Sequence, residues 1–302
     1  MSIATSLEAL AQIPGNHEIS SLTVTDAERL SGALDAQNFE MVKQMFATYG
    51  YIRLEKLFDV AQMQVWKSYY FDKYAWFMQR TKAPDRRPTV PLSIEGPFNS
   101  ASLLRNPILD QIITHFLGQY ILGALGSVIS FPGAPDQVLH RDSSPLFSQD
   151  NETDKDLPYF SFNMLLPLVD CTRETGRTRL WPGTHKIATK EEGLLVGSLD
   201  PDLSVGSVLL TDGRLLHRGA ANVSNMVRPI LYYSYQKRWY QDQFGYSKRP
   251  RILLSRREFD KMPNPLKEIL AWTHSDFRTL KVKHAILKRL PTPVINMLAS
   301  RL

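Results

Sequence analysis

The chain has 302 residues, of which 43% are hydrophobic, 10% aromatic and 22% charged. This composition supports a folded core and excludes a disordered chain or a fibrous repeat. The longest apolar stretches, such as residues 112–125, are interrupted by polar side chains before reaching the roughly 20 residues of a membrane span. Residues 1–14 lack the positive flank and the apolar centre of a secretory signal. We therefore expect an intracellular protein without a membrane span.

Cysteine content and charge narrow the class further. Cys171 is the single cysteine, so neither an internal disulfide nor a thiolate zinc site can form, which fits a reducing compartment. The net charge of +6 is uneven, because residues 237–302 contain 15 lysine and arginine residues against 5 acidic ones. These basic residues are not interleaved with aromatic side chains in a nucleic-acid-binding pattern. Solvated helix faces are therefore favoured, and no nucleic-acid partner is expected.

Helices are predicted for most of the first 126 residues. Apolar side chains recur there at spacings of three and four, and capping residues such as Thr25 and Asp59 precede the apolar runs. A short strand is expected at residues 51–54, and the proline-rich residues 82–97 are expected to form a long connecting loop. The expected helices are residues 25–33, 38–49, 59–78 and 107–123.

Extended segments dominate residues 127–240. Residues 159–169 alternate well, with Phe160, Phe162 and Met164 on one side. Loops rather than helices separate the strands, which favours an antiparallel sandwich or jelly roll over a parallel α/β sheet. Helix returns from residue 255. The other expected strands are residues 128–131, 137–142, 178–181, 207–210, 215–218 and 229–236.

We expect one domain over residues 1–302. It would combine a helical part at about 1–126, a jelly-roll core at about 127–240 and a basic helical part at about 241–302.

A candidate metal site begins with His140 and Asp142. On a strand, side chains two residues apart project from the same face, so this imidazole and this carboxylate would point to one spot. A second imidazole, His217, follows 75 residues later at the end of an apolar strand. Two histidines and one carboxylate can occupy one face of an octahedral ion and leave the other face open, as in non-haem Fe(II) oxygenases.

Arg228 lies 11 residues beyond His217. Residues 222–225 read as a turn, so a strand returning antiparallel would bring Arg228 back to the level of His217. A guanidinium there could clamp the far carboxylate of a dicarboxylate chelated to iron.

Three motifs in this order resemble those of one enzyme family. They are Gln137-Val-Leu-His140-Arg-Asp142, the stretch from Gly176 through Thr178 to Pro182-Gly-Thr-His185, and His217-Arg-Gly-Ala-Ala-Asn222-Val-Ser224 followed by Arg228. Together with residues 49–54 they resemble the phytanoyl-CoA dioxygenase family of Fe(II)/2-oxoglutarate oxygenases over roughly residues 35–240. Thr184 departs from the serine that is usual in this turn.

The resemblance implies an α+β fold with a double-stranded β-helix core, of the jelly-roll or cupin-like type, flanked by N-terminal and C-terminal helices. It implies a dioxygenase that uses Fe(II), 2-oxoglutarate and O2. His140, Asp142 and His217 would then bind the iron, and Arg228 would anchor 2-oxoglutarate. Gln137 and Thr178 would help to hold this co-substrate. No catalytic residue is expected beyond the metal centre.

The expected reaction is oxidation of an aliphatic C–H bond in a small-molecule substrate, by hydroxylation, desaturation or a related step. Aromatic residues at 66–77 and 232–246 favour a bulky apolar natural product, such as a terpenoid or polyketide. Two alternatives stay open. One is a peroxisomal acyl-CoA hydroxylase, favoured by the basic tail and by Ser300-Arg301-Leu302, which resembles a peroxisomal address. The other is a non-catalytic metal-binding jelly-roll protein. Location would be cytoplasmic or peroxisomal, and a homodimer is left open.

Three further features lie near the proposed ligands in the sequence. Residues 143–158 contain four acidic side chains and read as too polar for a core, so a mobile surface loop over the site is expected. A passive insertion is equally compatible. Asn163 faces either the site or solvent, and His185 is expected to support its turn rather than to act in catalysis.

Overall fold

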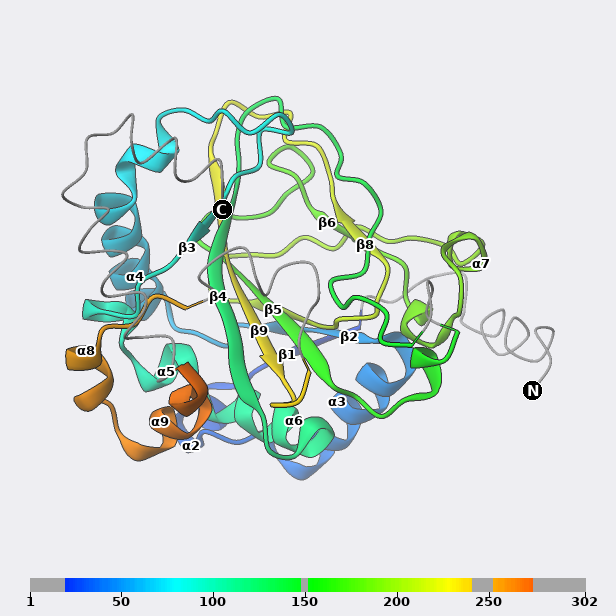
Figure 1. Cartoon of the computed structure of the whole chain (residues 1–302), viewed down its shortest axis with the longest axis horizontal. Coiled ribbons are helices and arrows are strands. Elements are labelled where there is room, and N and C mark those ends of the chain that lie inside the picture. The colour runs from blue at the N-terminus through cyan, green and yellow to red at the C-terminus, as the bar shows by residue number, and fades with distance from the viewer. Residues whose placement is uncertain (1–19, 148–151, 241–251, 274–302) are drawn as a thin grey trace.

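The computed structural model describes residues 20–147, 152–240 and 252–273. In this part of the chain, helices cover one face of a seven-stranded sheet, and a two-stranded sheet lies beyond its other face (Figure 1).

Capping residues set the boundaries of the first helices. Helix α2 (Asp26–Ser31) starts with a capping box, in which the Thr25 hydroxyl accepts a hydrogen bond from the Glu28 N–H and the Glu28 carboxylate accepts one from the Thr25 N–H. Helix α3 (Ala36–Tyr49) ends at Gly50, whose φ of 75° is left-handed and favours glycine. The remaining helices and helical turns are α4 (Val60–Lys73), η1 (Ala75–Met78), η2 (Gly96–Phe98), α5 (Ala101–Leu104), α6 (Pro107–Leu117), η3 (Asp154–Asp156), η4 (Thr184–Lys186), α7 (Lys190–Leu194), α8 (Arg256–Asp260), α9 (Asn264–Leu270) and η5 (Ala271–Thr273).

The large sheet has the strand order β1-β2-β7-β5-β9-β4-β3. Its neighbours pair antiparallel except β1 and β2, which are parallel. The small sheet pairs β6 with β8, also antiparallel. This pattern agrees with the antiparallel sandwich expected from the sequence. The strands are β1 (Ser21–Thr23), β2 (Tyr51–Glu55), β3 (Thr89–Pro91), β4 (Ile121–Ser130), β5 (Ser161–Pro167), β6 (Thr178–Leu180), β7 (Val208–Asp212), β8 (His217–Gly219) and β9 (Arg228–Gln236).

Three predicted elements differ from the structure. No strand forms over residues 137–142, where only His140 makes an isolated bridge, to His217. The helix expected over residues 107–123 ends at Leu117, because Gly118 takes a positive φ of 61°, and β4 begins at Ile121. Both segments are apolar and buried, and periodicity alone does not distinguish a buried helix from a buried strand. The loop expected at residues 82–97 contains the short edge strand β3.

The alternation of side chains along the strands separates two cores. Phe162, Met164 and Tyr233 project toward the helices and join the main core. A smaller cluster lies between the two sheets and includes Leu180 of β6 and Leu209 of β7. Apolar side chains therefore fill only part of the space between the two sheets. Polar side chains on the face of the large sheet that points toward the small sheet occupy the rest.

The loop at residues 143–158 is anchored at Asp154. This side chain is 1% exposed, its Oδ2 accepts a hydrogen bond of 2.6 Å from the Leu146 N–H, and its carbonyl accepts one of 2.6 Å from Arg214 Nη1. The expectation that the whole loop is too polar to pack was therefore wrong for this residue. Residues 148–151 lie outside the described ranges.

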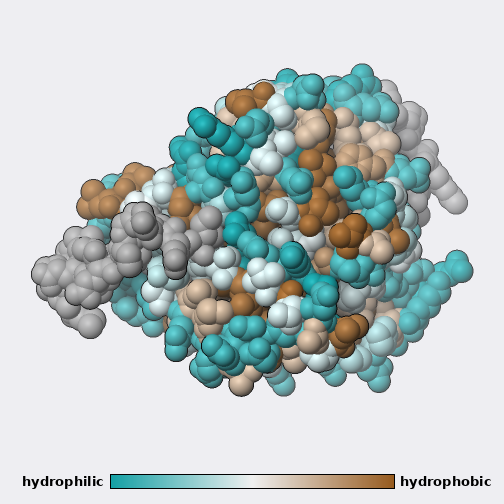
Figure 2. All heavy atoms as spheres, turned by 180° about the vertical axis from the view of Figure 1, so that it is seen from behind, coloured by the Kyte–Doolittle hydropathy of each residue, from teal (hydrophilic) through white to brown (hydrophobic). Residues whose placement is uncertain are grey.

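Apolar side chains also reach the surface. On the face seen from behind Figure 1 they gather near the middle, with polar side chains around them (Figure 2). Within the described ranges, no helix combines the length and the hydropathy that crossing a lipid bilayer requires. The tripeptide Ser300-Arg301-Leu302 and most of the basic C-terminal part lie outside the described residues.

Phe46 of α3 links the helical layer to the sheet, with ring centroids 4.7 Å from Phe162 and 5.1 Å from Phe116. It is fully buried. We expect Phe46→Ala to lower the free energy of unfolding by about 3–5 kcal/mol, because it removes a core side chain and leaves a cavity. Urea denaturation followed by circular dichroism measures this change. The exposed Val60→Ala on α4 is the control and should change stability by less than about 0.5 kcal/mol. An equal loss in both variants would contradict the packing role of Phe46.

Candidate metal centre

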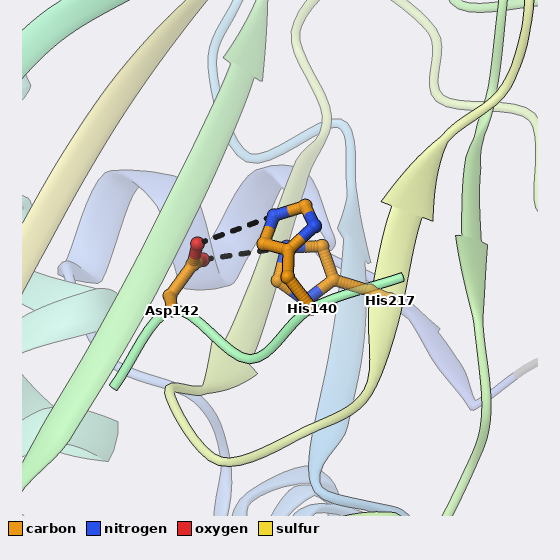
Figure 3. A group of neighbouring side chains, drawn as sticks. All are labelled: His140, Asp142 and His217. Atoms are coloured by element: carbon orange, nitrogen blue, oxygen red, sulfur yellow. Dashed lines mark ion pairs between the residues drawn. The ribbon is translucent and has the colours of Figure 1, made fainter. Parts of the chain in front are cut away.

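The structure brings His140, Asp142 and His217 together (Figure 3). His140 and His217 exchange two backbone hydrogen bonds, of 3.1 and 3.0 Å, so the segment before the loop is tied to β8. Asp142 faces both imidazoles. Its Oδ1 lies 3.6 Å from His140 Nε2, and its Oδ2 lies 3.4 Å from His217 Nε2. The three candidate ligand atoms lie within 4.8 Å of one another, as a single ion would require.

Both imidazoles are oriented by the backbone. His140 Nδ1 lies 2.8 Å from the Val138 carbonyl oxygen, and His217 Nδ1 lies 3.0 Å from the Leu215 carbonyl oxygen. A carbonyl oxygen only accepts, so each Nδ1 carries the proton and donates it. In a neutral imidazole the other nitrogen, Nε2, then presents its lone pair, and both Nε2 atoms point toward Asp142. This tautomer is the one that a histidine needs to bind a metal through Nε2.

The charge state of His140 supports the same arrangement. Burial lowers its pKa below the ordinary value, and the neighbouring His217 lowers it further, while Asp142 acts in the opposite direction. Burial therefore favours the neutral form of the His140 imidazole. Two imidazoles and a carboxylate converge on one point, and each of these groups can donate an electron pair to a metal ion. These residues fit a divalent metal ion.

Asn163 completes the surroundings of Asp142. It lies on β5, is buried, and its Nδ2 donates a hydrogen bond of 2.8 Å to Asp142 Oδ2. Tyr232 of β9 donates one of 2.9 Å to Asn163 Oδ1. The sequence left open whether Asn163 faces solvent or the site, and the structure places it in the site. The strand alternation put Asn163 on the polar face, but nothing in the sequence indicated its partner Tyr232.

Arg228 starts β9 and is 2% exposed. Its Nε donates to the Thr175 carbonyl at 3.3 Å, and no carboxylate pairs with it among the described residues. Burial lowers the pKa of this guanidinium. The predicted pairing of its strand with that of His217 was wrong, because β8 pairs with β6 and β9 pairs with β4 and β5. The turn after β8 instead carries the chain from one sheet to the other.

A second buried guanidinium, Arg87, was missed from the sequence. Its Nη2 donates to the carbonyls of Pro135 and Ala220, at 2.8 and 2.5 Å. Burial lowers its pKa to about 10, and the positive charge of Arg228 adds to that effect. Arg87 sits in a proline-rich stretch with no local motif, so only the tertiary structure shows that it lies beside Arg228. Together, Arg87 and Arg228 form a buried region of positive charge next to the end of β8.

Gln137 and Thr178 lie beside the same end of β8. Gln137 Oε1 accepts a hydrogen bond of 2.8 Å from the Gly219 N–H, and Thr178 is the β-partner of Gly219 across the small sheet. A Cβ at Gly219 would lie 2.6 Å from Gln137 Oε1 and 3.0 Å from Arg87 Nη1, so a larger residue there would displace the ends of these two side chains. The two predicted co-substrate residues therefore share one small region with Arg87.

The turn at residues 182–185 supports the metal centre from behind. The Thr184 hydroxyl donates to the Trp181 carbonyl at 2.6 Å and accepts from the Leu216 N–H at 2.9 Å, next to His217. A serine would offer the same hydroxyl, which explains why threonine is tolerated here. His185 is fully buried and lies outside the metal cluster, and burial lowers its pKa to about 4.

Comparison with known proteins gives consistent results. The family model for phytanoyl-CoA dioxygenase (PhyH) matches residues 46–230. Dioxygenase FUM3 of Gibberella moniliformis is 27% identical over 148 residues, which cover 44% of this chain and 48% of the relative. The Fe(II)/2-oxoglutarate-dependent dioxygenase nvfF of Aspergillus novofumigatus is 29% identical over 160 residues, covering 49% and 50%. The chain spans about half the length of the curated relatives it matches.

A solved structure shares the fold. The epimerase SnoN, in complex with Fe3+, alpha ketoglutarate and nogalamycin RO, superposes with a TM-score of 0.55 at 15% identity, covering 67% of this chain and 85% of that chain. This likeness bears on the fold alone, and it confirms the predicted jelly-roll core flanked by helices. Because the family model matches more than half of the sequence and the three predicted ligand residues meet in space, the chain belongs to the phytanoyl-CoA dioxygenase family.

Proposed function

We propose that this chain is an Fe(II)- and 2-oxoglutarate-dependent dioxygenase that oxidises an aliphatic C–H bond of a small molecule. The observation that carries the proposal is the combination of the His140–Asp142–His217 cluster with Arg228, a buried cation that no carboxylate of the described residues neutralises. A cluster of this kind alone fits any first-row metal ion. The additional buried guanidinium fits an anionic co-substrate beside the metal.

The chain's own residues would hold both groups. His140, Asp142 and His217 would bind Fe(II) through their converging atoms. Arg228 would anchor a carboxylate of 2-oxoglutarate, and Gln137 and Thr178 would bind beside it. When bound, Fe(II) and 2-oxoglutarate supply the reaction with O2, in which 2-oxoglutarate is decarboxylated to succinate and the substrate is oxidised. Arg87 would add a second positive charge to the same region.

A bulky apolar substrate is supported by the side chains beside the ligands. Val138 and Phe147 are 86% and 70% exposed, and both lie in the segment that carries His140 and Asp142. Large apolar side chains that stay exposed near a site can contact an apolar ligand. A terpenoid or polyketide natural product remains our proposal for the substrate. The basic tail and tripeptide that favoured an acyl-CoA lie largely outside the described residues.

The metal role of His140 is tested by His140→Ala. Loss of one of three protein ligands should remove Fe(II) binding, so we expect succinate formation from 2-oxoglutarate to fall to the level without enzyme. Succinate is measured after incubation with Fe(II), ascorbate and O2. The control is His115→Ala, which replaces an exposed histidine that packs against Phe39 and Phe116 away from the cluster and should keep full activity. Full turnover by His140→Ala would contradict the assignment.

The co-substrate role of Arg228 is tested by Arg228→Gln. Because the substitution removes a charge-assisted pair, we expect the affinity for 2-oxoglutarate to fall about 10–100-fold while Fe(II) still binds. Anaerobic titration of the Fe(II) protein with 2-oxoglutarate, followed by its weak visible charge-transfer band, measures this affinity. The matched control is Arg179→Gln. In the wild type the Arg179 guanidinium already pairs with Asp200 at 2.7 Å, so its loss should leave the affinity for 2-oxoglutarate unchanged.

The same titration distinguishes the proposed dioxygenase from the alternative, a non-catalytic metal-binding jelly-roll protein. A protein that holds a metal without using 2-oxoglutarate would give no charge-transfer band, and Arg228→Gln would leave 2-oxoglutarate binding unaltered. Either result obtained with folded, iron-loaded protein would favour that alternative.

A further inference from the structure

We propose that Asn163 and Tyr232 act in series as positioning residues that fix the carboxylate of Asp142 for metal binding. This inference rests on the proposed function, because it assigns a role toward the same metal. Neither Asn163 nor Tyr232 would itself be a ligand of the metal. Their contacts form one continuous hydrogen-bonded path from β9 through β5 to the candidate ligand.

The direction of every hydrogen bond in this path is determined. A carboxylate oxygen only accepts, so the Asn163 atom 2.8 Å from Asp142 Oδ2 must be the amide nitrogen. The amide oxygen then faces Tyr232, whose hydroxyl must donate to it at 2.9 Å. Tyr232 therefore fixes the amide of Asn163, and Asn163 in turn fixes the carboxylate of Asp142. Without the tyrosine hydroxyl, the amide loses the partner that keeps its nitrogen on the carboxylate.

The sheet register makes this contact possible. On the paired strands β5 and β9, Asn163 lies opposite Ser234 and Leu165 lies opposite Tyr232. Asn163 and Tyr232 are thus diagonal neighbours on one face, a separation that an aromatic side chain can span. Their sequence neighbours Phe162 and Tyr233 project to the opposite face, into the main core. The pair therefore belongs to the inner face of the sheet, where the metal cluster lies.

The consequence concerns the geometry of the ligand. An unrestrained carboxylate rotates about its Cβ–Cγ bond and can bind a metal through one or both oxygens. Here the Asn163 amide engages Oδ2, and Oδ1 stays 3.6 Å from His140 Nε2. Hydrogen-bonded partners of this kind orient metal ligands, and their loss typically weakens metal affinity 10–100-fold. Fixing Asp142 in this way would hold its two oxygens facing the two imidazoles, as a shared metal ion requires.

The test measures metal affinity rather than turnover. Fe(II) alone is titrated anaerobically, in competition with a chromophoric chelator, into the wild type, Asn163→Leu, Tyr232→Phe and the double variant. Leucine matches the size of asparagine but cannot donate. We expect Asn163→Leu to bind Fe(II) about 10–100-fold more weakly, and Tyr232→Phe to be weakened less. Because the two residues act in series, the double variant should bind no more weakly than Asn163→Leu.

Tyr233→Phe is the matched control on the same strand. Its hydroxyl is buried on the opposite face and has no hydrogen-bond partner among the described residues, so removing it should leave Fe(II) affinity unchanged. The absorption spectrum of the Co(II)-loaded proteins gives a second readout, because its ligand-field bands depend on coordination geometry. We expect these bands to shift in Asn163→Leu and Tyr232→Phe and to stay unchanged in Tyr233→Phe.

The outcomes separate this inference from the proposed function. If the wild type binds Fe(II) and 2-oxoglutarate but Asn163→Leu keeps full Fe(II) affinity, only the positioning role is wrong. Independent, additive losses in the double variant would also overturn it. If Asn163→Leu does not fold, Tyr232→Phe decides, and an affinity equal to that of Tyr233→Phe contradicts the inference. A wild type that binds no Fe(II) would instead refute the proposed function itself.

Discussion

The metal centre depends on the pair of backbone hydrogen bonds between His140 and His217. The two residues are far apart in sequence, and this pairing, flanked by backbone hydrogen bonds from Gln137 to Gly219 and from Ser143 to Gly213, sets their imidazoles side by side, with ring centroids 4.4 Å apart. Each Nδ1 then donates to the carbonyl two residues earlier in its own segment, so the same backbone that pairs also orients both rings. Asp142 lies two residues after His140 in the same segment, so the pairing that positions His140 also brings Asp142 near both imidazoles. A shift of one residue in the pairing would turn one ring to the opposite face.

Arg214 and Arg228 are both buried, but only Arg214 pairs with a carboxylate among the described residues. Arg214, in the turn between β7 and β8, is almost fully buried and bonds both oxygens of Asp212. Burial by itself lowers the pKa of Arg214, but the charge of Asp212 outweighs it and the pKa is raised. Arg228 is equally buried, and its pKa is lowered because no such carboxylate neutralises it. A buried charge without a partner is costly, so Arg228 is better explained by an anion that binds there than by stability.

Local sequence patterns predicted most of the elements and the metal cluster. The spacing of His140 and Asp142 predicted that they point to one spot, and they do, although only His140 pairs there, in an isolated bridge, and no strand forms over residues 137–142. The start of helix α2 and the end of helix α3 could be predicted because Thr25 and Gly50 are local signals. Features set by long-range pairing could not be found. Arg87 has no motif of its own, and the switch of the chain between sheets after β8 is invisible in a turn sequence.

The loop at residues 143–158 shows that amino-acid composition alone does not predict which polar residues are buried. Four acidic residues indicated a solvated segment, yet Asp154 is buried because Arg214 and the Leu146 N–H meet it there. Arg214 also accepts through its carbonyl a hydrogen bond of 2.9 Å from Arg141, between the two candidate ligands of the first motif. The loop is thereby joined to the turn that precedes His217 and to the segment that carries His140 and Asp142. Arg214 thus holds the loop through its guanidinium and the segment of the metal ligands through its backbone carbonyl, so substitution of its side chain would remove the first contact directly and leave the carbonyl in place.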